Sequence, residues 1–304
     1  MTRDRTTLGI LAMIAFAAIA PGMDAFAKAT PSEIPVGQVL GFRFGIQTAI
    51  LIPLALVLGV AGLPRLDEFA LHCARAAMVL LATGFFFTAL RYMPITNAIS
   101  IFFVEPFIVA LMGAAFLGES IGPRRLIACA VGFAGALLVI QPSFRDLGLP
   151  ALYPLATATL FAGYMILTRQ IAMRRHPVAV QAWTALAAAL MVVPLLWLFD
   201  GTGNQMLDPT VPTTFAWTTL LGVGLIATVS HLFLALALKL APASVIAPFQ
   251  YFEIVAATIL GLIYFGDFPN GLTWVGIAVI VGSGLYLFAR ERTIKEASNP
   301  EQQH

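Results

Sequence analysis

The sequence predicts an all-α polytopic membrane protein with ten transmembrane helices arranged as two inverted five-helix repeats. Three observations support this fold class: an apolar composition, ten apolar stretches of membrane-spanning length, and an internal repeat at a fixed offset. Of the 304 residues, 60% are hydrophobic and only 11% are charged, and the mean hydropathy is +0.91. A soluble domain has roughly a quarter charged residues, so this composition excludes an ordinary soluble enzyme.

Ten apolar stretches are each close to the ~20 residues that a membrane-crossing helix needs. Turn-rich or polar residues separate them, as at 30–35, 174–177 and 200–204. Each stretch is therefore expected to form one transmembrane helix. The expected helices span residues 8–28, 38–60, 70–90, 95–117, 123–141, 150–170, 178–199, 213–238, 243–265 and 271–290.

Basic residues near the ends of these stretches predict the orientation, because cytoplasmic loops retain Lys and Arg. We expect a multi-pass protein of the cell inner membrane with both termini in the cytoplasm. In this orientation only four basic residues fall on the opposite side, namely Lys28, Arg43, Arg91 and Arg145. The thirteen on the cytoplasmic side are Arg3, Arg5, Arg65, Arg75, Arg124, Arg125, Arg169, Arg174, Arg175, Lys239, Arg290, Arg292 and Lys295.

Residues 85–119 recur as residues 233–267, at an offset of 148. The alignment places the third to fifth stretches on the eighth to tenth, so each half holds five helices. Because five is odd, the second half crosses the membrane upside down relative to the first. Such inverted repeats are typical of secondary transporters, whose substrate site lies near the midplane between the halves. The identical pairs are Phe85/Phe233, Ala89/Ala237, Leu90/Leu238, Pro94/Pro242, Glu105/Glu253, Gly113/Gly261 and Gly118/Gly266.

The repeated segments resemble the EamA repeat of the drug/metabolite transporter superfamily. In the first half the resemblance lies in residues 90–94 and 116–119 and in the glycine-rich segment 132–135; in the second half it lies in residues 238–267. We expect a first EamA-like repeat over 1–141, a second, inverted repeat over 142–290 and a polar cytoplasmic tail over 291–304.

Asp24, Lys28 and Arg43 are similar to a first-repeat pattern of some family members, and the whole chain is similar to the YddG-type amino-acid exporters. The resemblance implies ten helices, two five-helix repeats, export of amino acids and no ATP-hydrolysing domain. Glu105 and Glu253 depart from the commonest form of the repeat, which has small or apolar residues at these positions.

Glu105 and Glu253 lie near the centres of their stretches. An ionisable group there is costly if it faces lipid, so both side chains are expected to face the bundle interior or water. They could bind a cationic group of a substrate or carry a proton. Equally, they could be neutral carboxyl groups that hydrogen-bond a neighbouring helix.

Several other residues near mid-span could contact the substrate, or could only join neighbouring helices. His231 could relay protons near neutral pH, or could be a hydrogen-bonded packing residue. Pro106 and Pro248 each free a backbone carbonyl near the midplane, which could provide a substrate ligand and a bending point, or they could only mark static kinks. The candidate substrate contacts beside the two glutamates are Gln250, Tyr251, Asn97, Ser100, Phe102 and Phe249.

Three charges mark the expected outer vestibule. Asp24 and Lys28 are four residues apart and share one face of the first helix. Arg43 lies close to the outer end of the second helix. These charges could hold a substrate carboxylate or latch an outer gate, or they could form a structural ion pair. Arg43 is also a candidate substrate-binding residue.

The sequence contains no P-loop, no H-E-x-x-H motif and no Cys/His metal cluster. We therefore expect no enzyme, no cofactor and no metal, and the net charge of +2 gives no indication of nucleic-acid binding. The expected partners are a small-molecule substrate and the lipid bilayer, and the sequence indicates no oligomeric state.

These observations predict a secondary transporter that moves small metabolites out of the cell by alternating access. The expected substrates are above all amino acids, including aromatic and hydrophobic ones. Export and the amino-acid class rest on the resemblance. The alternatives are an importer of a larger metabolite, such as a vitamin or a nucleotide-like compound, and a channel.

Overall fold

The computed structural model describes residues 3–92, 95–119, 122–140, 148–265 and 270–297. In these ranges the chain is all-helical and contains no β-strand. The elements in chain order are α1 (Arg3–Ala29), α2 (Val36–Val57), α3 (Leu66–Tyr92), α4 (Ile95–Phe102), α5 (Glu105–Leu117), α6 (Pro123–Ile140), η1 (Leu149–Ala151), α7 (Leu152–Ala172), α8 (Pro177–Leu198), α9 (Thr214–Leu240), α10 (Ala243–Ile246), η2 (Ala247–Tyr251), α11 (Phe252–Phe265) and α12 (Gly271–Ala297).

Two of the ten predicted stretches are interrupted near their middle. The stretch 95–117 forms α4 and α5, and the stretch 243–265 forms α10, η2 and α11. Proline has no N–H to donate and its ring clashes with the preceding turn, so a helix breaks or restarts there. Pro106 accordingly lies in the first turn of α5, and Pro248 lies in the first turn of η2. Both breaks place irregular backbone at mid-span.

Six helices are long and apolar enough to cross a membrane, namely α1, α2, α3, α7, α8 and α9, and shorter apolar helices accompany them in the described ranges. The chain is therefore a polytopic membrane protein. Helix α12 continues to Ala297 instead of ending at 290 as predicted. Residues 291–297 are mostly Glu, Arg, Lys and Ala, which favour a helix even outside an apolar span.

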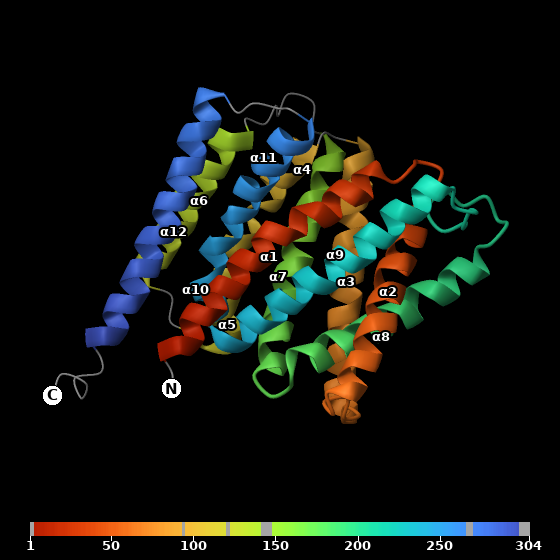
Figure 1. The fold of residues 1–304 in the computed structure, drawn as a ribbon, viewed down its shortest axis with the longest axis horizontal. Coiled ribbons are helices and arrows are strands. Elements are labelled where there is room, and N and C mark those ends of the chain that lie inside the picture. The colour runs from red at the N-terminus through yellow and green to blue at the C-terminus, as the bar shows by residue number, and fades with distance from the viewer. Residues whose placement is uncertain (1–2, 93–94, 120–121, 141–147, 266–269, 298–304) are drawn as a thin grey trace.

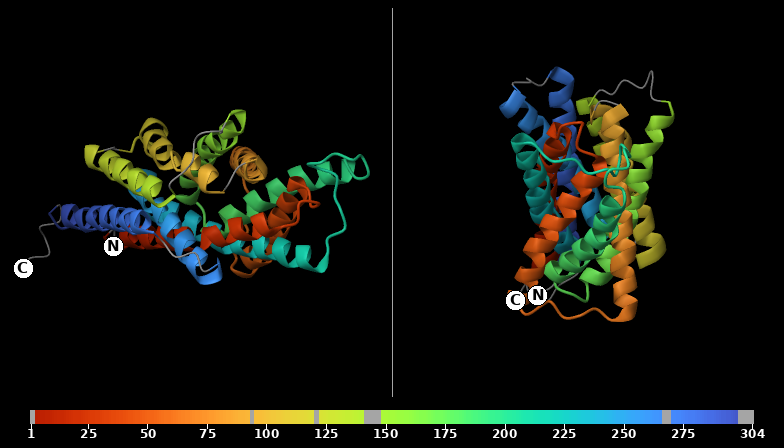
Figure 2. Two further views of the ribbon diagram at one scale, coloured as in Figure 1. Left: turned by 90° about the horizontal axis from the view of Figure 1, so that it is seen from above. Right: turned by 90° about the vertical axis from the view of Figure 1, so that its right-hand side faces the viewer.

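The helices lie side by side in one bundle, and the two chain ends lie at the same face (Figures 1 and 2). We call the face at Arg3 and Ala297 the termini face, and the opposite one the distal face. Helix α1 packs against α9 and α11, α3 packs against α7, and α2 packs against α8.

Helices α6 and α12 pack against each other at one side of the bundle (Figure 1). A Cβ atom added at Gly276 of α12 would lie 2.6 Å from the carbonyl oxygen of Gly135 in α6. Glycine at this position therefore allows the two backbones to approach closely, as small residues do in many membrane helix pairs.

Candidate functional site

A cavity lies among α1, α2, α3, α4, α7, α9 and α11, with an empty volume of about 620 Å³ that includes the part open to solvent. This volume lies within the ~300–1,000 Å³ range of small-molecule sites. Five phenylalanines form much of its wall: Phe16, Phe86, Phe87, Phe102 and Phe161. The polar lining residues are Asp24, Arg43, Thr83, Thr157, His231 and Glu253.

The cavity reaches from the middle of the bundle toward the distal face. Asp24 lies near the distal end of α1, and Arg43 and Thr83 lie in the distal halves of α2 and α3. His231 and Glu253 lie close to the middles of their spans and mark the inner end of the cavity.

Arg43 is the buried cation of the cavity. Its side chain is 1% exposed, its Nη1 donates to the Thr83 hydroxyl, and its Nη2 lies 2.9 Å from Nε2 of His231. Because a guanidinium only donates hydrogen bonds, Nε2 of His231 must accept and therefore has no proton. Nδ1 of His231 lies 3.3 Å from the Ser230 hydroxyl. Nε of Arg43 has no hydrogen-bond partner among the described residues.

Two carboxyl groups line the same cavity as this cation. Asp24 is 8% exposed, and it attracts Arg43 electrostatically. Glu253 is near enough to Asp24 for the two acidic groups to influence each other. The cavity therefore has a cationic side at Arg43 and an acidic side at Asp24 and Glu253. Lys28 is exposed and does not line the cavity, so the structure brings together two of the three predicted vestibule charges.

Glu105 lies outside the lining of this cavity and is 0% exposed. Neither of its carboxyl oxygens has a hydrogen-bond partner within the described ranges, and the same holds for Nε2 of Gln250. Tyr251 and Cys129 are close enough to Glu105 to interact with it electrostatically. The Tyr251 hydroxyl donates to the carbonyl oxygen of Phe103 at 3.1 Å, which joins the two interrupted spans.

The other predicted contacts fall in different places. Phe102 lines the cavity, with its ring centre 5.8 Å from that of Phe86. Phe249 is buried outside the cavity lining and stacks on Phe252 with ring centres 6.3 Å apart. The side chains of Asn97 and Ser100 lie outside the described residues.

Sequence reasoning missed Thr83, Thr157 and Phe161 as lining residues. Each lies in an apolar stretch, and only the rotation of its helix turns it toward the cavity. Arg75, one of the basic residues expected on the cytoplasmic side, is buried inside the bundle. It is 0% exposed within α3, where polar groups of α7 and α8 accept hydrogen bonds from its Nε and Nη1, while its Nη2 has no partner among the described residues.

Glu119 joins two helices at the termini face, directly after the left-handed C-cap Gly118 (φ 64°) of α5. The Glu119 carboxylate accepts the N–H groups of Ala243 and Ser244, at 3.1 and 3.0 Å, at the start of α10. Its Oε1 also lies 3.6 Å from Nε of Arg169 in α7. A carboxylate is favourable there, because the N-terminus of a helix presents free N–H groups.

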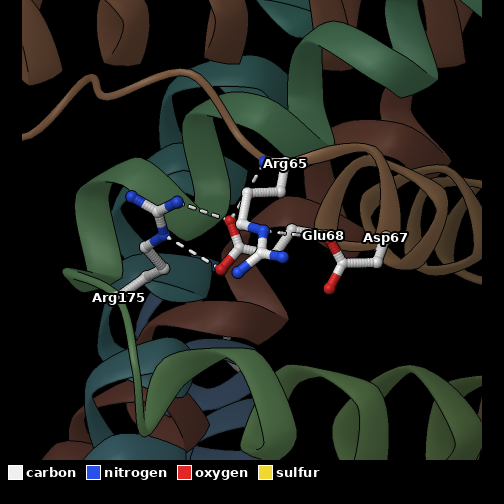
Figure 3. A network of polar contacts seen from close by, with 4 residues as sticks. All are labelled: Arg65, Asp67, Glu68 and Arg175. Atoms are coloured by element: carbon white, nitrogen blue, oxygen red, sulfur yellow. Dashed lines mark hydrogen bonds and ion pairs between the residues drawn. The ribbon is translucent and has the colours of Figure 1, made fainter.

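A second link across the termini face joins α3 to the loop before α8 (Figure 3). Nη2 of Arg175 lies 2.5 Å from Oε2 of Glu68, and Nε lies 3.4 Å from Oε1. This hydrogen bond raises the pKa of Arg175 above its ordinary value. Lys239 Nζ donates to the backbone oxygen of Arg175 at 3.2 Å. Glu119 and Glu68 therefore both link the first half of the chain to the second half at the termini face.

No cluster of three or more His, Cys, Asp or Glu residues that could hold a metal ion occurs in the described part of the chain. Residues 118–122 match the G-x-S-x-G spacing of serine hydrolases. That motif requires a strand before the serine, whereas α5 precedes it here, and Ser120 lies outside the described residues.

Comparison with known proteins identifies relatives over most of the chain. A riboflavin transporter of Brucella anthropi is 28% identical over 262 residues, which cover 86% of this chain and 91% of the relative. The pseudopaline exporter CntI of Pseudomonas aeruginosa is 28% identical over 287 residues, covering 92% and 94%. An S-adenosylmethionine uptake transporter of Rickettsia bellii is 24% identical over 269 residues, covering 88% and 89%.

A solved crystal structure with 22% sequence identity superposes with a TM-score of 0.74 over 92% of this chain and 96% of that chain. At this identity the likeness shows the fold alone. The model of the EamA-like transporter family matches residues 7–141 and 148–289. This chain therefore belongs to the EamA-like transporter family and is a multi-pass membrane transporter of a small-molecule substrate.

Proposed function

We propose that this protein is a secondary transporter for metabolites that combine a zwitterionic head with an apolar or ring-bearing remainder. The aromatic and hydrophobic amino acids are the simplest members of this class. One observation carries the proposal: a single cavity holds a buried guanidinium, two carboxyl groups and five phenylalanines. The charged groups suit the two ends of a zwitterion, and the rings suit an apolar side chain.

The chemistry of each group assigns it a part in substrate binding. Arg43 has an Nε without a partner in the described structure, and guanidinium groups bind carboxylates through paired N–H donors. Asp24 and Glu253 attract an ammonium group, which phenylalanine faces also favour through cation–π contact. Phe86, Phe102 and their neighbours then pack against the remainder of the substrate.

Alternating access between two inverted five-helix repeats explains how this cavity moves its substrate. The helix bounds support such a repeat, since α3 (66–92) and α9 (214–240) begin and end 148 residues apart, and α4 (95) and α10 (243) begin at the same offset. The repeats would be 1–141 and 142–290, with ten crossings and cytoplasmic termini in the inner membrane. Rocking of the halves would open the termini face and close the distal face.

We propose export as the direction, on the family resemblance and on the exporter among the relatives. A second candidate is an importer of a vitamin-like or nucleotide-like metabolite, and relatives named for riboflavin transport and S-adenosylmethionine uptake favour it. The two candidates differ in their need for charge. An amino acid requires Arg43 and an acidic partner, whereas an uncharged vitamin requires mainly the phenylalanine walls.

Exchange assays with purified protein in liposomes test both candidates. We expect saturable exchange of labelled phenylalanine and leucine, and loss of this exchange in Arg43→Gln. The exposed Lys28→Ala variant is the matched control and should exchange like the wild type. Riboflavin exchange that survives Arg43→Gln would instead support the second candidate. Flux that does not saturate would support a channel and contradict both.

A further inference from the structure

Glu105 and Glu253 are equivalent in the sequence repeat, but their surroundings in the structure differ. Each lies at the start of the helix that follows a break: Glu105 is the first residue of α5, and Glu253 is the second residue of α11. Glu253 lines the cavity, whereas Glu105 is 0% exposed and does not line it. The two carboxyl groups therefore differ in access, although their positions in the two halves correspond.

The polar atoms at Glu105 lack partners. In the described structure no group hydrogen-bonds either of its carboxyl oxygens or Nε2 of Gln250, which is 2% exposed. The Gln250 amide lies close enough to the Glu105 carboxyl to become its hydrogen-bond partner after a small shift. Buried polar atoms in proteins are nearly always hydrogen-bonded. The amide supplies one such bond, and the second carboxyl oxygen of Glu105 then still lacks a partner, which points to a ligand group that this conformation does not admit.

The contact of Glu119 at the termini face also joins the segments that carry Glu105 and Gln250, namely α5 and the segment α10–η2. Glu119 follows the last turn of α5, whose first residue is Glu105. Its carboxylate binds the first N–H groups of α10, and α10 leads directly into η2 with Gln250. At the middle of the bundle the Tyr251 hydroxyl joins the same two spans through Phe103. Release of Glu119 would free α5 and α10 at the termini face while the Tyr251 contact remains as a pivot.

We propose that Glu105 and Gln250 form a second cation-binding half-site, which opens toward the termini face when the cavity at Glu253 closes. This inference rests on the alternating access proposed above. In an inverted repeat the second state resembles the first with the two halves exchanged. In that second state Glu253 becomes buried and the Glu105 carboxyl becomes accessible from the termini face. Glu253 then holds the ammonium group of the substrate in one state, and Glu105 holds it in the other.

Thiol labelling measures the change in access directly. Cys73 and Cys129 are the only cysteines of the chain, so they are first replaced by alanine. Glu105→Cys and Glu253→Cys are then introduced singly and treated with a hydrophilic maleimide in vesicles of both orientations. We expect Glu253→Cys to react from the distal face and Glu105→Cys to be protected from both faces.

Adding Glu119→Gln should reverse this pattern. Labelling of Glu105→Cys from the termini face should rise about fivefold or more, and labelling of Glu253→Cys should fall, as expected for two sites coupled through one equilibrium. Arg169→Gln weakens the same contact and serves as a second variant if Glu119→Gln fails to fold. Glu119→Asp keeps the charge and should change the labelling less. Unchanged labelling of Glu105→Cys in folded Glu119→Gln and Arg169→Gln proteins would overturn the proposal.

Sided exchange tests what the half-site binds. Glu105→Gln should weaken phenylalanine affinity at the termini face by about tenfold, the loss expected when a charged ligand loses its partner, and should leave affinity at the distal face unchanged. Glu253→Gln should do the reverse. Equal losses at both faces, or exchange that persists in Glu105→Gln with only its pH dependence removed, would contradict an ammonium site. The labelling result needs no substrate, so it can fail while the proposed function stands, or hold while the substrate class is wrong.

Discussion

Arg43 in the distal half of the bundle and Arg75 in the termini half are both buried, but their surroundings differ. Arg43 lines the cavity beside His231 and faces an acidic side of the same space. Arg75 lies outside the cavity lining. Its Nε donates to the Thr168 hydroxyl at 3.1 Å, and its Nη1 donates to the carbonyl oxygen of Val180 at 3.1 Å.

The difference shows that one side-chain type serves two purposes in this bundle. Arg75 also bonds the Thr184 hydroxyl, and its guanidinium carbon lies 5.0 Å from the centre of the Tyr164 ring. Its partners belong to α7 and α8, so it fastens α3 to both helices. Arg43 keeps its charge beside open space instead. The termini half is packed around Arg75, although its Nη2 lacks a partner in the described structure, whereas in the distal half Arg43, the proposed ligand-binding cation, lies beside the cavity.

Replacement of Arg75 should have the largest effect on stability. Arg75→Ala removes three hydrogen bonds of a buried charged group and leaves a cavity, so we expect the free energy of unfolding to fall by about 2–4 kcal/mol. Denaturant or thermal unfolding in detergent measures this change. Arg43→Gln should lose exchange activity with a smaller loss of stability.

The exposed Arg65 is the matched control for Arg75. Its side chain is 82% exposed and lies 3.6 Å from Asp67, which is itself exposed (Figure 3). Arg65→Ala should change the free energy of unfolding by no more than about 0.5 kcal/mol. If Arg75→Ala unfolds like Arg65→Ala, the termini half does not depend on its buried arginine and the contrast with Arg43 fails.

The packing around Tyr251, between the termini half and the distal half of the bundle, can be tested at Gly132 of α6. A Cβ atom there would lie 2.5 Å from Cδ2 of Tyr251, whose hydroxyl joins the two interrupted spans. Gly132→Ala should displace this ring and lower the free energy of unfolding by about 1–3 kcal/mol. Gly45→Ala meets no atom within 4 Å and should raise stability slightly, because alanine favours a helix. Equal unfolding of the two variants would show that Tyr251 is not held tightly.

Hydropathy predicted where the helices lie, because membrane thickness fixes how long an apolar stretch must be. The positions of Pro106 and Pro248 indicated a bending point or a static kink in two spans, and the structure shows breaks there. Family membership was also confirmed, since the motifs around the repeat are local in sequence. The inverted repeat and the substrate class remain predictions.

Other features of the site depend on packing that no local pattern contains. Thr83 and Phe161 line the cavity because of how α3 and α7 are rotated, and polar threonine is common in membrane helices for other reasons. The basic-residue count could not distinguish a loop arginine from the buried Arg75. Glu105 and Glu253 occupy equivalent positions in the sequence repeat, whereas in the structure only Glu253 lines the cavity and Glu105 is fully buried.

The smallest expected effect lies at the rim of the termini face, where Glu68 binds Arg175 (Figure 3). The two side chains are 18% and 31% exposed, so Glu68→Gln should lower the free energy of unfolding by no more than about 1 kcal/mol at low salt. In about 1 M salt the Debye length falls to roughly 3 Å, and the difference from wild type should shrink. Asp67→Asn is the control, because its partner Arg65 is far more exposed, and it should have no measurable effect at either salt concentration. A Glu68→Gln effect that does not change with salt would show that this contact holds the termini face by packing rather than by charge.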